Sequence, residues 1–129
     1  GLAKCIDGGS SRVHQDMFVV HRLDCETSGV MVFARSTQAA SRLSAAWRER
    51  RTRKIYHAIV SEWNSEDKEG KIDAPLAPHP TERLKWIVAE AEHQGKPSTT
   101  IWKVLEEIPG KGILLHLAPI TGRTHQLRV

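Results

Sequence analysis

The alternation of apolar and polar residues along the chain predicts several short strands. Residues 55–60 alternate, and their tyrosine, alanine and final valine would share one face of a strand. Residues 98–106 and 113–118 contain the threonines and branched apolar side chains that are typical of strands. The short Pro-Gly-Lys-Gly turn between them predicts that these two strands pair antiparallel.

A different pattern appears nearer the start of the chain. Residues 30–35 are apolar without alternation, which predicts a strand in the centre of a sheet. Ser36 or Thr37 can then cap a helix. Apolar residues recur at helical spacing after this cap: Ala39, Ala40, Leu43, Ala46 and Trp47. This stripe predicts a helix that covers one face of the sheet.

Weaker patterns predict the remaining elements. Residues 72–76 are expected to form a short edge strand that prolines terminate, and residues 81–90 a further strand. Thr124 is a suitable cap for a helix that would run to the last residue. Residues 1–16 show neither period and are expected to form a loop or linker.

Length and composition restrict the choice of protein class. A chain of 129 residues with 40% apolar residues can form at most one small domain with a modest core. Its net charge of +4 suits an anionic partner without proving one. Cys5 and Cys25 lack the spacing of a disulfide framework or zinc site, which favours a reducing compartment. Without a long apolar run or a signal peptide, the sequence predicts a soluble cytoplasmic protein with no membrane partner.

The first candidate for chemistry is the loop 21–29, His-Arg-Leu-Asp-Cys-Glu-Thr-Ser-Gly, directly ahead of the apolar run 30–34. Loops at the edge of a rigid sheet often carry catalytic side chains. An ordinary polar turn, in which Asp24 caps a backbone amide, is the commoner explanation of such a local pattern. Taken alone, the loop therefore favours the ordinary turn.

The second candidate is a basic segment, residues 48–54, which has five basic residues in seven positions. Such a segment can grip nucleic-acid phosphates. It is also what a solvated helix end looks like, because cations stabilise a helix C-terminus by about 0.3–1 kcal/mol each. Tyr56, the only tyrosine of the chain, follows in the next strand and could equally be a core aromatic.

The third candidate is the closing stretch 119–129. Gly122 permits a sharp turn, and a helix beginning at Thr124 would place its amide donors close to Arg123. That arrangement forms an anion site. The alternative is a plain strand-to-helix turn with a surface arginine.

Together, these stretches resemble the RluA family of pseudouridine synthases, and most closely the RluA type itself. The resemblance rests on the loop 21–29, the strand start Lys54-Ile55-Tyr56 and the closing residues 122–129, which occur in the family's order. It extends through residues 95–100 and 117–121 and so covers nearly the whole chain from Val20. The first and last motifs are specific, whereas the Tyr56 motif alone would be weak.

The resemblance implies a fold and a reaction. The fold would be α+β, with a mixed, mainly antiparallel sheet and helices packed on it. The reaction would be a cofactor-free isomerisation of uridine in RNA, in which Asp24 is the catalytic carboxylate and Arg123 orients it through a charge-assisted pair. Tyr56 would lie against the base, where stacking is a safer role than proton removal because a phenol is a poor base at neutral pH.

The resemblance also implies how RNA would be bound. Arg22 would enter the RNA helix in place of the flipped base, and Leu127 would pack beneath the tyrosine and keep the pocket dry. Phosphate contacts would come from the basic segment, namely from Arg50, Arg51, Arg53 and Lys54. The expected partner is structured ribosomal or transfer RNA, and no spacing of histidines and cysteines suggests a metal.

Family members normally have further strand sequence before the Asp24 loop and after the closing motif. We therefore expect residues 1–129 to form a single, partial catalytic domain. Two alternatives stay open: an RNA-binding fragment or homologue without activity, and a glycosidic hydrolase that uses Asp24. The hydrolase is disfavoured because Glu26 is the only acid near Asp24 in sequence. The target uridine is not readable from the sequence, and for oligomeric state a monomer is favoured.

Overall fold

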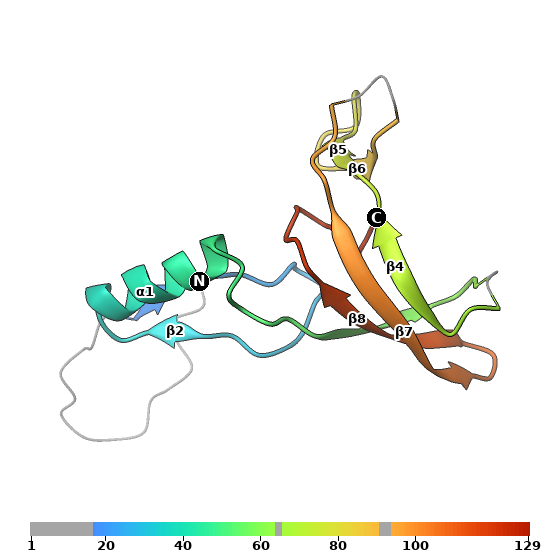
Figure 1. The fold of residues 1–129 in the computed structure, drawn as a ribbon, viewed down its shortest axis with the longest axis horizontal. Coiled ribbons are helices and arrows are strands. Elements are labelled where there is room, and N and C mark those ends of the chain that lie inside the picture. Colours follow the sequence, from blue (N-terminus) through green and yellow to red (C-terminus); the bar gives the residue numbers. More distant parts are fainter. Residues whose placement is uncertain (1–16, 64–65, 91–93) are drawn as a thin grey trace. The chain divides into compact units, whose positions relative to one another are not determined.

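The computed structural model describes residues 17–63, 66–90 and 94–129 (Figure 1). The chain divides into two compact units, residues 1–49 and 50–129, each with its own secondary structure. The loop or linker predicted for residues 1–16 lies outside the described residues. The prediction that residues 1–129 form one partial catalytic domain stays a prediction.

The first unit contains a strand pair and a helix. Strand β1 (Phe18–Val19) pairs antiparallel with β2 (Phe33–Ala34), and α1 (Thr37–Arg48) follows. The Ser36 hydroxyl accepts a hydrogen bond from the Ala39 amide at 3.1 Å, which satisfies one of the free amides at the helix start. The predicted helix and its cap are confirmed.

The prediction of a central strand over residues 30–35 is wrong in its extent. Only Phe33 and Ala34 are in a strand, and the side chain of Val30 is 87% exposed. A strand extends only as far as a neighbour accepts and donates its backbone hydrogen bonds. In this unit, β1 supplies two residues for that purpose.

His21 holds the loop between β1 and β2 in place. Its Nε2 accepts a hydrogen bond from the Val32 amide at 2.8 Å. Its ring stacks on Trp47 of α1, with ring centroids 4.6 Å apart and planes 15° from parallel. His21 therefore joins the loop to the helix.

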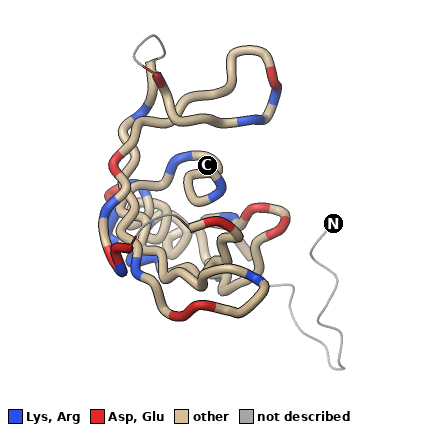
Figure 2. Tube along the Cα trace, turned by 90° about the vertical axis from the view of Figure 1, so that its right-hand side faces the viewer, with Lys and Arg blue, Asp and Glu red and all other residues tan. Residues whose placement is uncertain are grey.

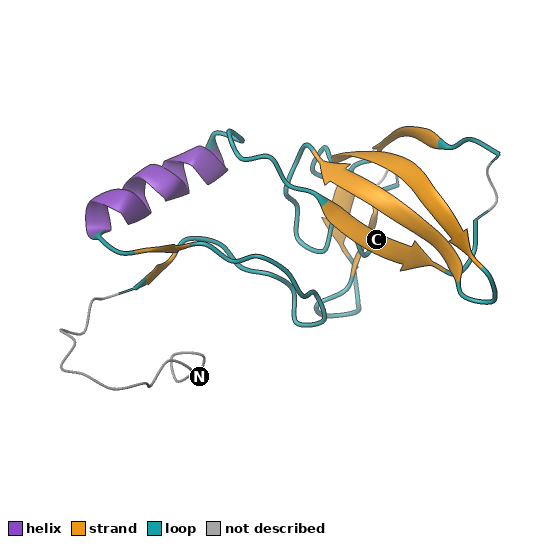
Figure 3. Cartoon of the chain, turned by 90° about the horizontal axis from the view of Figure 1, so that it is seen from below, coloured by secondary structure: helices purple, strands orange, loops and turns teal. Residues whose placement is uncertain are grey.

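The second unit is built on a four-stranded antiparallel sheet in the order β3–β8–β7–β4 (Figures 1 and 3). The long strands β7 (Thr99–Ile108) and β8 (Gly112–Pro119) form the predicted hairpin, and β3 (Tyr56–Val60) pairs with β8. At the hairpin end Gly112 has a φ of +121°, and a Cβ there would overlap the Val60 carbonyl. Only glycine fits this position.

Residues 69–90 differ in detail from the prediction. The edge strand is β4 (Glu69–Asp73), which pairs with β7, whereas β5 (Leu76–Pro78) and β6 (Trp86–Val88) form a separate pair. The strand expected over residues 81–90 is reduced to β6, because residues 79–85 form the connecting turn. In that turn, Nδ1 of His79 accepts the Glu82 amide at 3.0 Å.

The core of the second unit lies on one face of the sheet. Trp102, Leu115 and Leu117 are buried there, and each buried side chain of this size stabilises the fold by about 1.5–3 kcal/mol. A helix together with antiparallel sheets is an α+β fold, as predicted. Within the described ranges, no helix has the length and apolar content needed to cross a membrane.

Candidate active site

Arg123 lies in the turn that follows β8. The helix predicted from Thr124 is wrong, because residues 124–128 form hydrogen-bonded turns. His125 has a φ of +54°, a left-handed conformation that an α-helix cannot include. Its carbonyl accepts hydrogen bonds from the amides of Arg128 at 2.8 Å and Val129 at 3.2 Å.

The side chain of Gln126 holds this turn together. Its Oε1 accepts hydrogen bonds from the Thr121 hydroxyl at 2.8 Å and from the Arg123 amide at 2.9 Å. Its Nε2 donates to the Thr99 carbonyl and the Thr100 hydroxyl, both at 3.0 Å. All four bonds come from one half-buried side chain, so the backbone at Arg123 is fixed to the start of β7.

Thr121 strengthens the same connection. Its hydroxyl accepts a hydrogen bond from the Thr99 amide at 2.9 Å, and the Ile120 amide donates to the Thr99 carbonyl at 3.0 Å. Thr121 is only 5% exposed. The end of β8 and the start of β7 therefore form a rigid base for the Arg123 turn.

The guanidinium of Arg123 is oriented by a backbone carbonyl. Its Nε donates to the Pro97 carbonyl at 2.9 Å, and the side chain is half-buried. Among the described residues, no other group accepts a hydrogen bond from it. The two terminal nitrogens are thus available to bind a carboxylate or phosphate in the planar, two-pronged manner typical of arginine.

Tyr56 and Leu127 both pack on the core face of the sheet. Tyr56 begins β3 and is in register with Leu117 of β8, which is itself in register with Trp102 of β7. Tyr56 and Leu127 are both half-buried and pack against the same cluster of Trp102, Leu115 and Leu117. The structure thus brings two predicted site residues that are far apart in sequence onto one apolar surface.

Figure 2 colours all lysines and arginines of the chain blue, and those of the basic segment ahead of β3 differ in exposure. Arg50, Arg51 and Arg53 are exposed. Lys54 is half-buried, and its ammonium donates to the Thr121 carbonyl at 2.9 Å. Burial, and to a lesser degree the charge of Arg50, lowers the pKa of Lys54 below its ordinary value.

Asp24 belongs to the first unit, in the loop between β1 and β2. The Thr27 amide donates to the Asp24 backbone carbonyl at 3.0 Å and closes a turn at residues 25–26. Asp24 is half-buried, whereas Arg22 is exposed. Because Tyr56 and Arg123 belong to the second unit, their predicted convergence with Asp24 stays a prediction.

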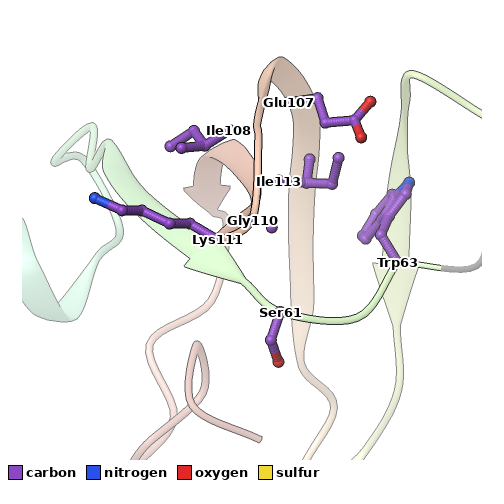
Figure 4. Close-up of a pocket in the computed structure, with 8 residues that line it drawn as sticks. Ser61, Trp63, Glu107, Ile108, Gly110, Lys111 and Ile113 are labelled. Atoms are coloured by element: carbon purple, nitrogen blue, oxygen red, sulfur yellow. The ribbon is translucent and has the colours of Figure 1, made fainter.

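Two further observations concern residues other than the predicted site residues. Among the described residues, no three histidine, cysteine or acidic side chains come together as a metal site. A hollow of about 380 Å³ lies at the hairpin end of the sheet, lined among others by Ser61, Trp63, Glu107 and Ile113 (Figure 4). No predicted site residue lines it.

Sequence reasoning missed the residues that support Arg123. Gln126 belongs to the closing motif and Pro97 and Thr99 to the stretch 95–100, but the sequence pattern indicates no role for any of them. A glutamine three positions after an arginine in a turn is a usable signal, because its amide can reach back to the arginine's backbone. Its bonds to residues 99 and 100, however, depend on the tertiary fold.

Comparison with known proteins identifies relatives of this arrangement. The model of the RNA pseudouridylate synthase family matches residues 4–129. The chain is 42% identical over 137 residues to the dual-specificity RNA pseudouridine synthase RluA of Vibrio parahaemolyticus, covering 99% of this chain and 53% of the relative. It is 38% identical to the ribosomal large subunit pseudouridine synthase C of Vibrio vulnificus, covering 86% of this chain and 33% of that protein.

Solved structures show the same likeness. Human RNA pseudouridylate synthase domain containing 1 matches with a TM-score of 0.79 and 30% identity, over 88% of this chain and 49% of that one. Human RNA pseudouridylate synthase domain containing 4 matches with a TM-score of 0.70 and 30% identity, over 88% and 45%. The chain thus spans about half the length of the RluA relative and slightly less than half the length of each of these two structures.

Proposed function

Because the chain belongs to the RNA pseudouridylate synthase family, we propose that it carries the centre that converts uridine to pseudouridine in structured RNA. The observation that carries this proposal is the rigid turn that presents the Arg123 guanidinium with its terminal nitrogens available. An arginine held in this way is suited to pairing with one carboxylate, and Asp24 lies in the family's aspartate motif.

The reaction we propose needs no cofactor. The bond between N1 of uracil and C1′ of ribose breaks, the base turns, and C5 joins C1′. C5 then loses its proton and N1 gains one, so that the product is an isomer of the uridine. Breaking a glycosidic bond develops positive charge on the sugar, and the Asp24 carboxylate would stabilise or attack that centre. Arg123 would keep the carboxylate oriented and ionised by donating hydrogen bonds to it.

Tyr56 would provide the surface on which the base turns. Tyr56 packs against the buried cluster of Trp102, Leu115 and Leu117, which would support the ring. Leu127 packs against the same cluster and would help to exclude water from the detached base. Stacking on a firmly supported aromatic ring holds a uracil without restricting its rotation in the ring plane.

The RNA would be gripped outside this centre. The exposed arginines ahead of β3 would contact phosphates, and Arg22 would fill the space that the flipped uridine leaves. One relative is named as an enzyme of the large ribosomal subunit, which supports ribosomal RNA as a substrate class, and transfer RNA is proposed beside it from the resemblance to the RluA type.

The test is a pair of variants in one loop. Asp24→Asn removes the carboxylate charge without changing its shape, and Glu26→Gln makes the same change at an exposed acid two residues away. Each protein is incubated with a structured, uridine-containing RNA, and the products are separated. We expect Asp24→Asn to lose pseudouridine formation while RNA affinity stays within several-fold, and Glu26→Gln to keep both.

Other products would point to the alternatives. Free uracil would identify a glycosidic hydrolase, and binding without any product would identify an RNA-binding piece of an enzyme. An Asp24→Asn protein that still forms pseudouridine would remove Asp24 from the catalytic role.

A further inference from the structure

Lys54 differs from the other cations of the basic segment. Its ammonium lies 2.9 Å from the Thr121 carbonyl oxygen, 67 positions away in sequence, whereas Arg50, Arg51 and Arg53 are exposed. A lysine that contacts phosphates normally extends into water, where its charge is fully solvated. Lys54 instead directs its charge into the protein.

Placing the ammonium charge of Lys54 inside the protein is unfavourable, and the pKa of Lys54 is lowered for this reason. Burial is the larger cause, and the neighbouring charge of Arg50 adds to it. Gly122 lies beside the ammonium. A Cβ on this residue would be 3.3 Å from the Lys54 nitrogen, so the ammonium would have to shift by a few tenths of an ångström.

The atom that Lys54 contacts is important for the site. Thr121 lies two residues before Arg123, and its hydroxyl is already bound by Gln126 and Thr99. Lys54 binds the carbonyl of the same residue, so both polar ends of Thr121 are held. Since Lys54 also lies two residues before Tyr56, its bond connects the start of the Tyr56 strand to the Arg123 turn.

We propose that Lys54 is a positioning residue that fixes the Arg123 turn relative to Tyr56, and that it is not a contact to RNA phosphate. The expected effect on the reaction rate rests on the proposed function, whereas the placement of Lys54 against the Thr121 carbonyl does not. Lys54 would bind a carbonyl of the protein, and the neighbouring arginines of the basic segment would bind RNA phosphates.

The experiment uses three matched variants of the full chain. Lys54→Met removes the ammonium and keeps most of the stem, Arg53→Met does the same at an exposed neighbour, and Lys111→Met alters an exposed lysine in the hairpin turn. For each variant we measure the salt dependence of RNA affinity, the single-turnover rate at saturating RNA, and hydrogen exchange of the Arg123 amide.

We expect Lys54→Met to leave the slope of log affinity against log salt unchanged, because the phosphates keep all their partners. Its rate at saturating RNA should fall about 10- to 100-fold, the effect of a small misplacement of a catalytic group. Exchange at Arg123 should accelerate, since that amide depends on the fixed turn. Arg53→Met should flatten the salt slope by roughly 0.7, and Lys111→Met should leave slope and rate unchanged.

A second perturbation reaches the same contact from the opposite side. Gly122→Ala crowds the ammonium while leaving Lys54 in place, and it should also lower the rate without altering the salt slope. Lys54→Arg, which keeps a donor and a charge, should recover part of the rate.

A Lys54→Met protein whose salt slope falls like that of Arg53→Met, with an unchanged rate and unchanged Arg123 exchange, would identify Lys54 as a phosphate contact and overturn the proposal. If the unaltered chain forms no pseudouridine, the proposed function fails. In that case Arg123 exchange and the salt slope still decide the placement of Lys54.

Discussion

Replacing Gln126 with leucine should show how much the Arg123 turn depends on one side chain. Leucine has a similar size but can make none of the four hydrogen bonds that Gln126 makes. The partners include the hydroxyls of Thr100 and Thr121, and these two residues are only 6% and 5% exposed. Water can therefore replace the glutamine at only some of these groups.

The expected destabilisation follows from these hydrogen bonds. A hydrogen bond contributes about 0.5–1.5 kcal/mol net, and a buried polar group left without a partner costs about 1–3 kcal/mol. Because Gln126 is itself half-buried, solvent offsets part of this cost. We expect Gln126→Leu to lower the free energy of unfolding of the second unit by roughly 2–4 kcal/mol.

Urea unfolding followed by tryptophan fluorescence measures this change. In a Trp47→Phe background the signal comes from the second unit, which contains the other three tryptophans. Gln38→Leu, at an exposed position of α1, is the matched control and should leave this transition unchanged. A decrease of less than about 0.5 kcal/mol for Gln126→Leu would show that other interactions hold the turn.

Two further predictions concern RNA binding and the core. Arg50, Arg51 and Arg53 are the arginines between α1 and β3, and all three are exposed. Replacing all three with alanine should flatten the salt dependence of RNA affinity by roughly 0.7 log units for each phosphate that is no longer bound; an unchanged slope in an anisotropy titration would assign them to a solvated surface. Gly70→Ala should destabilise the second unit by about 1–3 kcal/mol, because the new Cβ would lie 2.8 Å from the ring of the buried Trp102; an unchanged urea midpoint would show that the ring can move aside.

Local pattern was sufficient for the elements whose signals lie in adjacent residues. The alternation over residues 55–60 predicted β3, in which Tyr56, Ala58 and Val60 are half-buried and His57 and Ile59 are exposed. The short turn at residues 109–112 predicted the β7–β8 hairpin, and Ser36 predicted the start of α1. In each case the deciding interaction joins residues close in sequence, so the sequence pattern contains it.

Prediction from pattern was wrong where distant residues decide the conformation. The apolar residues 30–35 look like a buried strand, but the strand is only as long as its partner β1. The closing residues look like a helix, but the left-handed His125 and the bonds of Gln126 to β7 form a turn instead.

The candidate site also combines features that the sequence determines with features that only the tertiary structure decides. The sequence alone determined which residue types are present and in what order: an aspartate loop, a tyrosine strand, a basic segment and an arginine turn. Only the tertiary structure decided that Tyr56 and Leu127 share a surface, that the Pro97 carbonyl orients Arg123, and that Lys54 binds Thr121. The physical reason is that a side chain's hydrogen-bond partner depends on which backbone atoms the fold brings within about 3 Å, and residue spacing does not specify these atoms.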